Sequence, residues 1–172
     1  YLVLLAVAGV GAALRMDNLP HQPVDVQSMK DVARDRDGWV LSLLYIGTFG
    51  SFIGFSFAFG QMLTMTFLAN GQSPGEAALH AAQLTFLGPL LGSLTRMGGG
   101  RLSDRVGGSR VTFWTFCAMA VTTLALVYSS TLQAGGDGTL SGGALVLFFA
   151  AFLTLFALTG LGNASVYTMI PA

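Results

Sequence analysis

Long apolar runs separate the charged residues of this chain. No Asp, Glu, Lys or Arg occurs in residues 38–75, 77–95, 111–136 or 138–172. A membrane-spanning helix needs about 20 predominantly apolar residues, and each run has room for one. The pattern therefore predicts four full membrane helices. We expect them at residues 39–67, 77–100, 111–129 and 143–171.

The first apolar run differs from these four. Residues 1–14 are too few for a complete span and lack the basic start and cleavage site of a signal peptide. We interpret them as the end of a helix, followed by a hydrophilic segment at residues 15–37. The chain begins without methionine and ends just after a proline with no polar tail, so we expect a fragment of a longer polytopic protein.

The connections between the predicted helices are rich in turn-forming residues, with the sequences ANGQSPGE, GRLSDRVGGSR and STLQAGGDGTLS. Pro89 lies inside the second full helix, where packing in a membrane tolerates a kink. Basic residues gather in the hydrophilic segment and in the connection after the second full helix. They are Arg15, Lys30, Arg34, Arg36, Arg101, Arg105 and Arg110. The positive-inside rule places both segments in the cytoplasm, because the other two connections contain no basic residue.

The composition excludes several classes of protein. Hydrophobic residues make up 53% of the chain and charged residues 9%, which is not the composition of a soluble globular domain. The formal net charge of +0 gives no reason to expect nucleic-acid binding. Cys117 is the single cysteine, so an intrachain disulfide is excluded. Neither a P-loop nor metal-ligand spacing of histidines occurs, and we expect no enzyme, no metal and no cofactor.

Arg96 is the most informative residue, because a guanidinium is costly in a membrane segment and normally faces a polar cavity that holds an anion. Gly88, Gly92 and Arg96 are spaced four apart and form one stripe on a helix. We expect space for a small ligand beside the two glycines. The alternative is an interfacial arginine that snorkels to the cytoplasmic headgroups.

Other residues are candidates for the same site. Tyr45 and Phe49 are also four apart and share a face, which suits a hydrogen bond to a planar anion and a ring that covers it; the alternative is an aromatic packing face. Asn163 either lines the cavity or bonds to a neighbouring helix. Gly50 and Gly54 form a G-x-x-x-G pair, which predicts a close helix contact.

The connection after the second full helix carries the pattern G-x-L-x-D-R-x-G-x-x-R. Its residues are Gly100, Leu102, Asp104, Arg105, Gly107 and Arg110. An aspartate here can pair with arginines and with the positive N-terminus of a neighbouring helix, which would hold the cytoplasmic side shut. We interpret the pattern as a gate. An ordinary positive-inside loop would explain the arginines but not the glycines and the aspartate in register.

These residues resemble a known family. The pattern is similar to a cytoplasmic loop motif of the major facilitator superfamily. The segments WVLSLLYIGTFGSFIGFSFAFG, FLGPLLGSLTRMGGGRLSDRVGGSRVT and GLGNASVYTMIP resemble the nitrate/nitrite porters of the NarK type. The resemblance runs from about Met16 to the end of the chain. It implies an all-α polytopic helical bundle in which residues 1–14 end helix 6, residues 15–37 form the central cytoplasmic loop, and residues 38–172 form helices 7–10.

The resemblance also implies a function. Arg96 would bind the anion together with an arginine outside this chain, and Tyr45 and Phe49 would line the site. The expected partners are nitrate, nitrite and the lipid bilayer of the bacterial inner membrane, without nucleic acid, for a monomer that works by alternating access. Exchange of nitrate for nitrite is favoured, because the predicted spans contain no acidic residue apart from Glu76 at the outer boundary of one of them, near His80. Proton symport, a porter for another small anion, and a non-transporting sensor or scaffold are the alternatives.

Overall fold

The structure is a computed structural model that describes residues 2–15, 34–134 and 142–170. The chain divides into two units, residues 1–35 and residues 36–172. In the first unit, helix α1 covers Leu2–Arg15, close to the predicted end of a helix at residues 1–14. Most of the predicted cytoplasmic loop, residues 16–33, lies outside the described residues.

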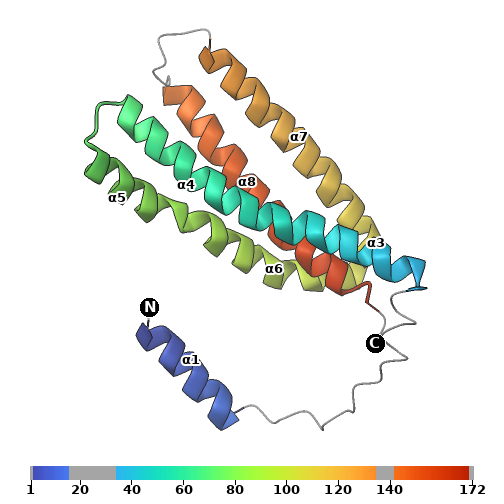
Figure 1. The fold of residues 1–172 in the computed structure, drawn as a ribbon. Helices are drawn as coiled ribbons and strands as arrows, with labels where there is room; N and C mark the ends of the chain where they lie inside the picture. The colour runs from blue at the N-terminus through green and yellow to red at the C-terminus, as the bar shows by residue number, and fades with distance from the viewer. Residues whose placement is uncertain (1, 16–33, 135–141, 171–172) are drawn as a thin grey trace. The chain divides into compact units, whose positions relative to one another are not determined.

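The second unit contains four helical segments that are long and apolar enough to cross a membrane (Figure 1). The first consists of α3 (Arg36–Tyr45), η1 (Ile46–Gly50) and α4 (Ser51–Ala69). The second consists of α5 (Pro74–Thr85) and α6 (Leu87–Val106), and the others are α7 (Gly108–Ala134) and α8 (Gly142–Tyr167). The predicted all-α polytopic architecture is confirmed, with helix ends that differ from the predicted ones by up to six residues.

The second segment is interrupted at Phe86, one helical turn before Pro89. Pro89 has no backbone N–H, so the carbonyl of Thr85, four residues earlier, receives no helical hydrogen bond from it, and the proline ring crowds that carbonyl. Accordingly α5 ends at Thr85, and Phe86 separates it from α6. The helix resumes at once, since the Leu90 N–H donates to the Phe86 carbonyl at 3.1 Å.

The turn between α4 and α5 follows from its sequence. Gly71 has a positive φ of 83°, which a residue with a side chain rarely adopts. Ser73 then caps α5 in a capping box: its hydroxyl accepts from the Glu76 N–H, and the Glu76 carboxylate accepts from the Ser73 N–H. The Glu76 side chain thus stabilises the N-terminus of α5.

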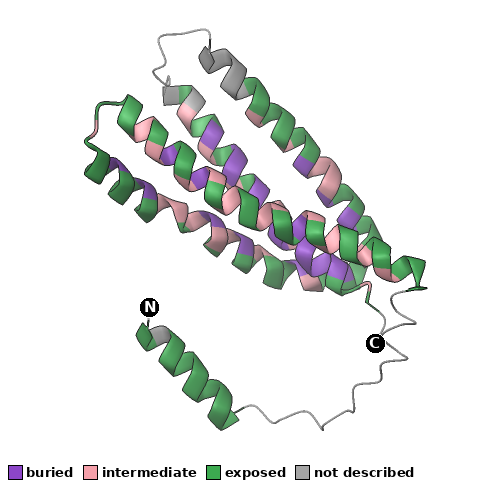
Figure 2. Ribbon diagram, in the orientation of Figure 1, coloured by how far each residue is buried: buried purple, intermediate pink, exposed green. Residues whose placement is uncertain are grey.

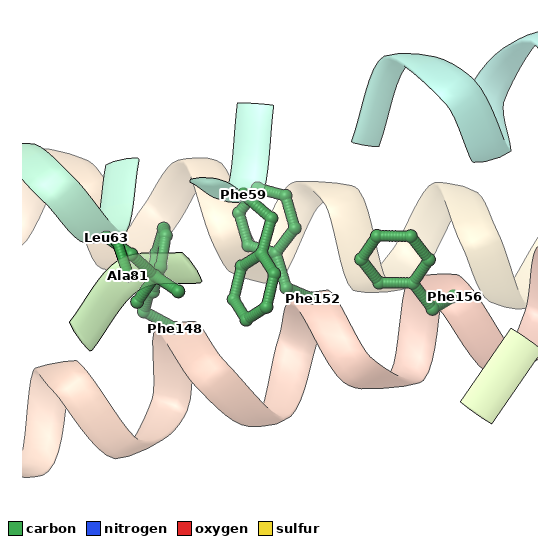
Figure 3. Close-up of a cluster of buried hydrophobic side chains, with 6 residues drawn as sticks. All are labelled: Phe59, Leu63, Ala81, Phe148, Phe152 and Phe156. Carbon is green, nitrogen blue, oxygen red and sulfur yellow. The ribbon is translucent and has the colours of Figure 1, made fainter. Parts of the chain in front are cut away.

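Aromatic side chains form the core between α4, α5 and α8. The buried cluster, labelled in Figure 3, consists of Phe59, Leu63, Ala81, Phe148, Phe152 and Phe156. Helix α8 is the most enclosed of the four segments: 44% of its most apolar window is buried, against 6% for the first segment (Figure 2). The other helices therefore pack around α8.

Glycines bring α6 and α8 into close contact. A Cβ atom on Gly160 of α8 would collide with the backbone carbonyl oxygen of Gly92 and would lie 2.5 Å from the Thr95 hydroxyl. The Thr95 hydroxyl donates to the Ala157 carbonyl at 3.0 Å, which ties the two helices together. The backbones can approach this closely only because both crossing positions lack side chains.

This packing corrects one expectation from the sequence. Beside Gly88 and Gly92 there is no room for a ligand, because the Phe156 ring occupies the space next to Gly88 and the Phe52 ring lies 2.7 Å from the position of a Cβ atom on Gly92. The predicted G-x-x-x-G contact is wrong as well within the described part of the chain, since a Cβ on Gly54 would meet nothing within 4 Å. Spacing alone identified the glycine stripes but not what packs on them.

Candidate functional site

Arg96, on α6, faces an aromatic ring from α8. Its guanidinium carbon lies over the ring of Tyr167, 5.1 Å from the ring centroid. A cation this close to an aromatic face is attracted to the negative charge of the π-system. Among the described residues, Arg96 forms no ion pair with a carboxylate. Within the described part of the chain, a neutral ring therefore holds this positive charge.

Tyr167 connects Arg96 to the predicted aromatic pair on the first segment. The Tyr167 hydroxyl donates a hydrogen bond to the Tyr45 hydroxyl at 3.3 Å. The two rings meet edge to face, with centroids 5.5 Å apart and planes at 83°. Tyr45 in turn stacks on Phe49, with centroids 5.5 Å apart and planes at 10°. The structure thus brings Arg96, Tyr45 and Phe49 into one group around Tyr167.

A π-helical turn shapes the aromatic pair. Phe49 lies in η1, and Tyr45 directly precedes it, so the pair spans a local widening of the helix. Single π-turns inside α-helices occur frequently at functional sites.

The pair is supported from the core. Phe49 stacks on Phe52 with centroids 6.5 Å apart, and Phe52 meets the buried Phe156 edge to face at 5.7 Å. Phe156 belongs to the core cluster. The rings around Arg96 are therefore continuous with the best-packed part of the unit, and this limits their freedom to move.

One side of this group is open. Arg96 is exposed, and Tyr167 and Phe49 are 46% and 36% exposed. The exposed parts of Arg96, Tyr167 and Phe49 make up the open side of this connected group. A guanidinium offers paired N–H donors in a plane, and flat rings can cover a planar ligand. This combination suits a small planar anion.

Two of the predicted site residues, Gly92 and Asn163, are buried. Gly92 is buried at the crossing of α6 and α8 described above. Asn163 is 5% exposed within the packed part of α8, and its side-chain oxygen has no hydrogen-bond partner among the residues described. Both residues are therefore buried, whereas Arg96 is exposed. The nearby Ser165 bonds to a neighbouring helix, since its hydroxyl and that of Thr112 on α7 are 2.7 Å apart.

Tyr167 was not among the sequence candidates. It lies near the end of the last apolar run, a position that is typical of interfacial aromatic residues. The sequence alone therefore does not distinguish Tyr167 from such a residue. One signal was present: Asn163 and Tyr167 are four apart, so a helix places them on one side. Only the packing of α8 against α6 and α3 shows that this phenol meets both Arg96 and Tyr45.

The predicted gating motif is not a loop. Gly100, Asp104 and Arg105 lie in α6, which continues to Val106, and Arg110 lies in the first turns of α7. Gly107 alone separates the two helices. Its φ of 101° and ψ of 128° require glycine, because a Cβ atom clashes with the backbone in that region. The motif therefore encodes a helical corner, and the connection that the sequence predicted between Gly100 and Val111 is reduced to Gly107.

The corner packs against the end of α8. A Cβ on Gly108 would lie 2.8 Å from the Ser165 carbonyl oxygen and 2.6 Å from the Thr168 hydroxyl. Asp104 and Arg105 are exposed on the same corner. The predicted pairing of Asp104 with arginines is absent from the part of the chain that the structure describes, where no ion pair involves this carboxylate.

Comparison with known proteins gives a consistent result. No family model matches the chain. The chain is 40% identical to the nitrate/nitrite transporter NarU of Salmonella typhimurium and 37% identical to NarU of Escherichia coli, in both cases over 97% of this chain and 33% of the relative. It is 33% identical to the probable nitrate/nitrite antiporter NarK2 of Thermus thermophilus over 94% of this chain and 34% of the relative. The chain thus spans about a third of the length of these relatives.

The four membrane-length helices and these bacterial transporter relatives indicate a multi-pass inner-membrane chain that is similar to nitrate/nitrite transporters. The predicted resemblance to the NarK-type nitrate/nitrite porters is confirmed over nearly the whole chain. These relatives are named as transporters or antiporters rather than enzymes, in agreement with the expectation from the sequence.

Proposed function

We propose that this chain is the part of a nitrate and nitrite transporter that supplies one arginine of the anion site. The observation that carries the proposal is the group formed by Arg96, Tyr167, Tyr45 and Phe49. Nitrate and nitrite are small planar anions with delocalised charge, and the planar donors of Arg96 match them better than a point charge would. The names of the relatives support the same substrates.

The position of this part within the transporter follows from the resemblance. We propose that α1 is the end of helix 6, that residues 15–37 are the central cytoplasmic loop, and that the four spans are helices 7–10 of a monomeric transporter that works by alternating access. The short corner at Gly107 then joins helices 8 and 9 on the cytoplasmic side. Mass measurement of the detergent-purified transporter tests the monomer, and a dimeric mass would contradict it.

We further propose that nitrate is exchanged for nitrite. A proton-coupled carrier normally keeps a titratable group at membrane depth. In the described spans the acidic residues, Asp37, Glu76 and Asp104, all lie within a few residues of a helix end. Glu76 caps α5, and His80 is bonded to Gln72 at 2.9 Å between ring Nδ1 and side-chain oxygen. The name of the Thermus relative, a probable antiporter, favours exchange too.

The exchange mechanism has a direct test in proteoliposomes that contain the complete transporter. When the site is empty, its uncompensated arginine opposes the change between the two access states. A bound anion balances this charge and makes the change easier. Vesicles loaded with nitrite should take up external nitrate without a pH gradient, and unloaded vesicles should not. Nitrate accumulation in unloaded vesicles after external acidification would instead establish proton symport. The absence of nitrate and nitrite movement under both conditions would contradict the proposed function.

A further inference from the structure

We propose that Tyr167 is a positioning residue of the anion site, whose ring holds the Arg96 guanidinium and whose hydroxyl holds the Tyr45 phenol. The inference rests on the proposed transport of nitrate and nitrite. It assigns to the site a residue at the end of α8 that the sequence did not predict. Three observations support it: the contact of the ring with Arg96, the direction of the hydrogen bond to Tyr45, and the packing beneath Tyr167.

The contact between the Tyr167 ring and Arg96 positions the arginine without a carboxylate. A long arginine side chain needs a partner that fixes its head, and a carboxylate is the usual one. A carboxylate, however, would compete with an anionic substrate for the same donors. The neutral Tyr167 ring, 5.1 Å from the guanidinium carbon of Arg96, attracts the cation through its quadrupole instead. The guanidinium is thereby positioned while its full positive charge stays available to the substrate.

The hydroxyl contact determines how Tyr45 can act. A phenol has one O–H to donate and lone pairs that accept. Because the Tyr167 hydroxyl donates to the Tyr45 oxygen at 3.3 Å, the O–H of Tyr45 remains free to donate elsewhere. The open side beside Arg96 is where an anion would accept it. The hydrogen bond from Tyr167 thus leaves the O–H of Tyr45 available as a second donor next to the guanidinium of Arg96.

The backbone beneath Tyr167 is fixed. Val166 is 2% exposed and Ser165 is fully buried, and the Ser165 hydroxyl is paired with that of Thr112 on α7. Tyr167 is the last residue of α8, and its side chain extends from this packed base to the open side. Such a base provides the preorganisation that lowers the cost of ordering a binding site when the ligand arrives.

The test separates the ring from the hydroxyl and from simple packing. Tyr167→Phe keeps the ring and removes the hydroxyl, whereas Tyr167→Met keeps an apolar side chain and removes the ring. The initial rate of nitrate uptake into nitrite-loaded proteoliposomes is measured over a range of nitrate concentrations for the complete transporter. We expect Tyr167→Met to raise the apparent KM by about tenfold with little change in the maximal rate, and Tyr167→Phe to raise it by about threefold. Trp114→Met is the control, because it removes an exposed ring of α7 that contacts Phe113.

A double-mutant cycle tests the hydroxyl pair independently of the ring. The Tyr45→Phe substitution removes the hydroxyl of Tyr45. This removes both the oxygen that accepts from Tyr167 and the O–H that is free to donate. If Tyr167 acts through Tyr45, adding Tyr167→Phe to Tyr45→Phe should raise the KM no further. If the fold-changes in KM of the two Phe substitutions multiplied in the double variant, the coupling would be overturned. This test does not depend on whether Tyr167→Met inserts into the membrane.

The outcomes also separate this proposal from the proposed function. Wild-type vesicles that take up no nitrate would overturn both. Normal wild-type uptake with an unchanged KM in Tyr167→Met, or with a KM change equal to that of Trp114→Met, would overturn the positioning role alone. A loss confined to the maximal rate in all Tyr167 variants would assign the residue to packing. A raised KM for Met, a smaller rise for Phe and a normal control would support the proposal.

Discussion

The guanidinium carbon of Arg96 lies 5.1 Å from the ring centroid of Tyr167, so the arginine of one helix is held by the last residue of another. A snorkelling arginine extends along its own helix toward the headgroups, where water solvates it. Arg96 instead contacts α8, and through Tyr167 it is linked to Tyr45 on α3. This relationship favours a binding role for Arg96.

Replacing Arg96 with Lys should severely reduce nitrate uptake. Lysine keeps the positive charge and can still approach the Tyr167 ring, but it loses the planar paired donors that match the anion. A lost charge-assisted bond costs about 2 kcal/mol, so we expect roughly a thirtyfold loss of uptake at low nitrate concentration. Membrane insertion, measured by the amount of purified monodisperse protein, should be unchanged. Uptake equal to wild type would remove Arg96 from the site and restore the snorkelling interpretation.

Much of this structure could be predicted from the sequence, because hydropathy and charge are sufficient to locate membrane spans. The four spans, the break caused by Pro89 and the candidate residues Arg96, Tyr45 and Phe49 all follow from local pattern. The filling of the space beside Gly88 by Phe156 does not, because it depends on how α8 crosses α6. Tyr167 was missed for the same reason: its partners come from two other helices.

Replacing Asp104 with Asn should slow turnover more than it weakens anion binding. The carboxylate is exposed at the corner between α6 and α7, close in sequence to the N-terminus of α7, whose positive end favours a negative charge. Removing that charge should shift the balance between the two access states. The check compares the nitrate dissociation constant with the maximal exchange rate. A weaker binding constant with a normal maximal rate would contradict the gating role.

Replacing Gly107 with Ala should destabilise the transporter. The residue has a φ of 101° and forms the whole junction between α6 and α7, so a side chain would have to strain the backbone by about 1–3 kcal/mol. We expect a lower thermal unfolding temperature in detergent. Gly98→Ala is the matched control, because Gly98 is inside α6 and has nothing within 4 Å of an added Cβ. Equal unfolding temperatures for the two variants would show that the corner tolerates a side chain.

The crossing of α6 and α8 should be the position least tolerant of an added methyl group. A Cβ on Gly160 would collide with the Gly92 carbonyl oxygen and crowd the Thr95 hydroxyl, whose bond to the Ala157 carbonyl joins the helices. Both obstacles belong to backbone or to a bonded side chain, so the helices must separate. Overpacking of this kind costs about 1–3 kcal/mol.

Gly160→Ala should therefore lower the unfolding temperature and also weaken nitrate binding, because moving α8 displaces Tyr167 from Arg96. Gly75→Ala is the control: that glycine is in the first turn of α5 with open space around it, and alanine there should be neutral or slightly stabilising. The thermal unfolding temperature and the nitrate dissociation constant are measured on the same samples. If Gly160→Ala lowered the unfolding temperature but left the dissociation constant unchanged, the position of α8 would not control the anion site.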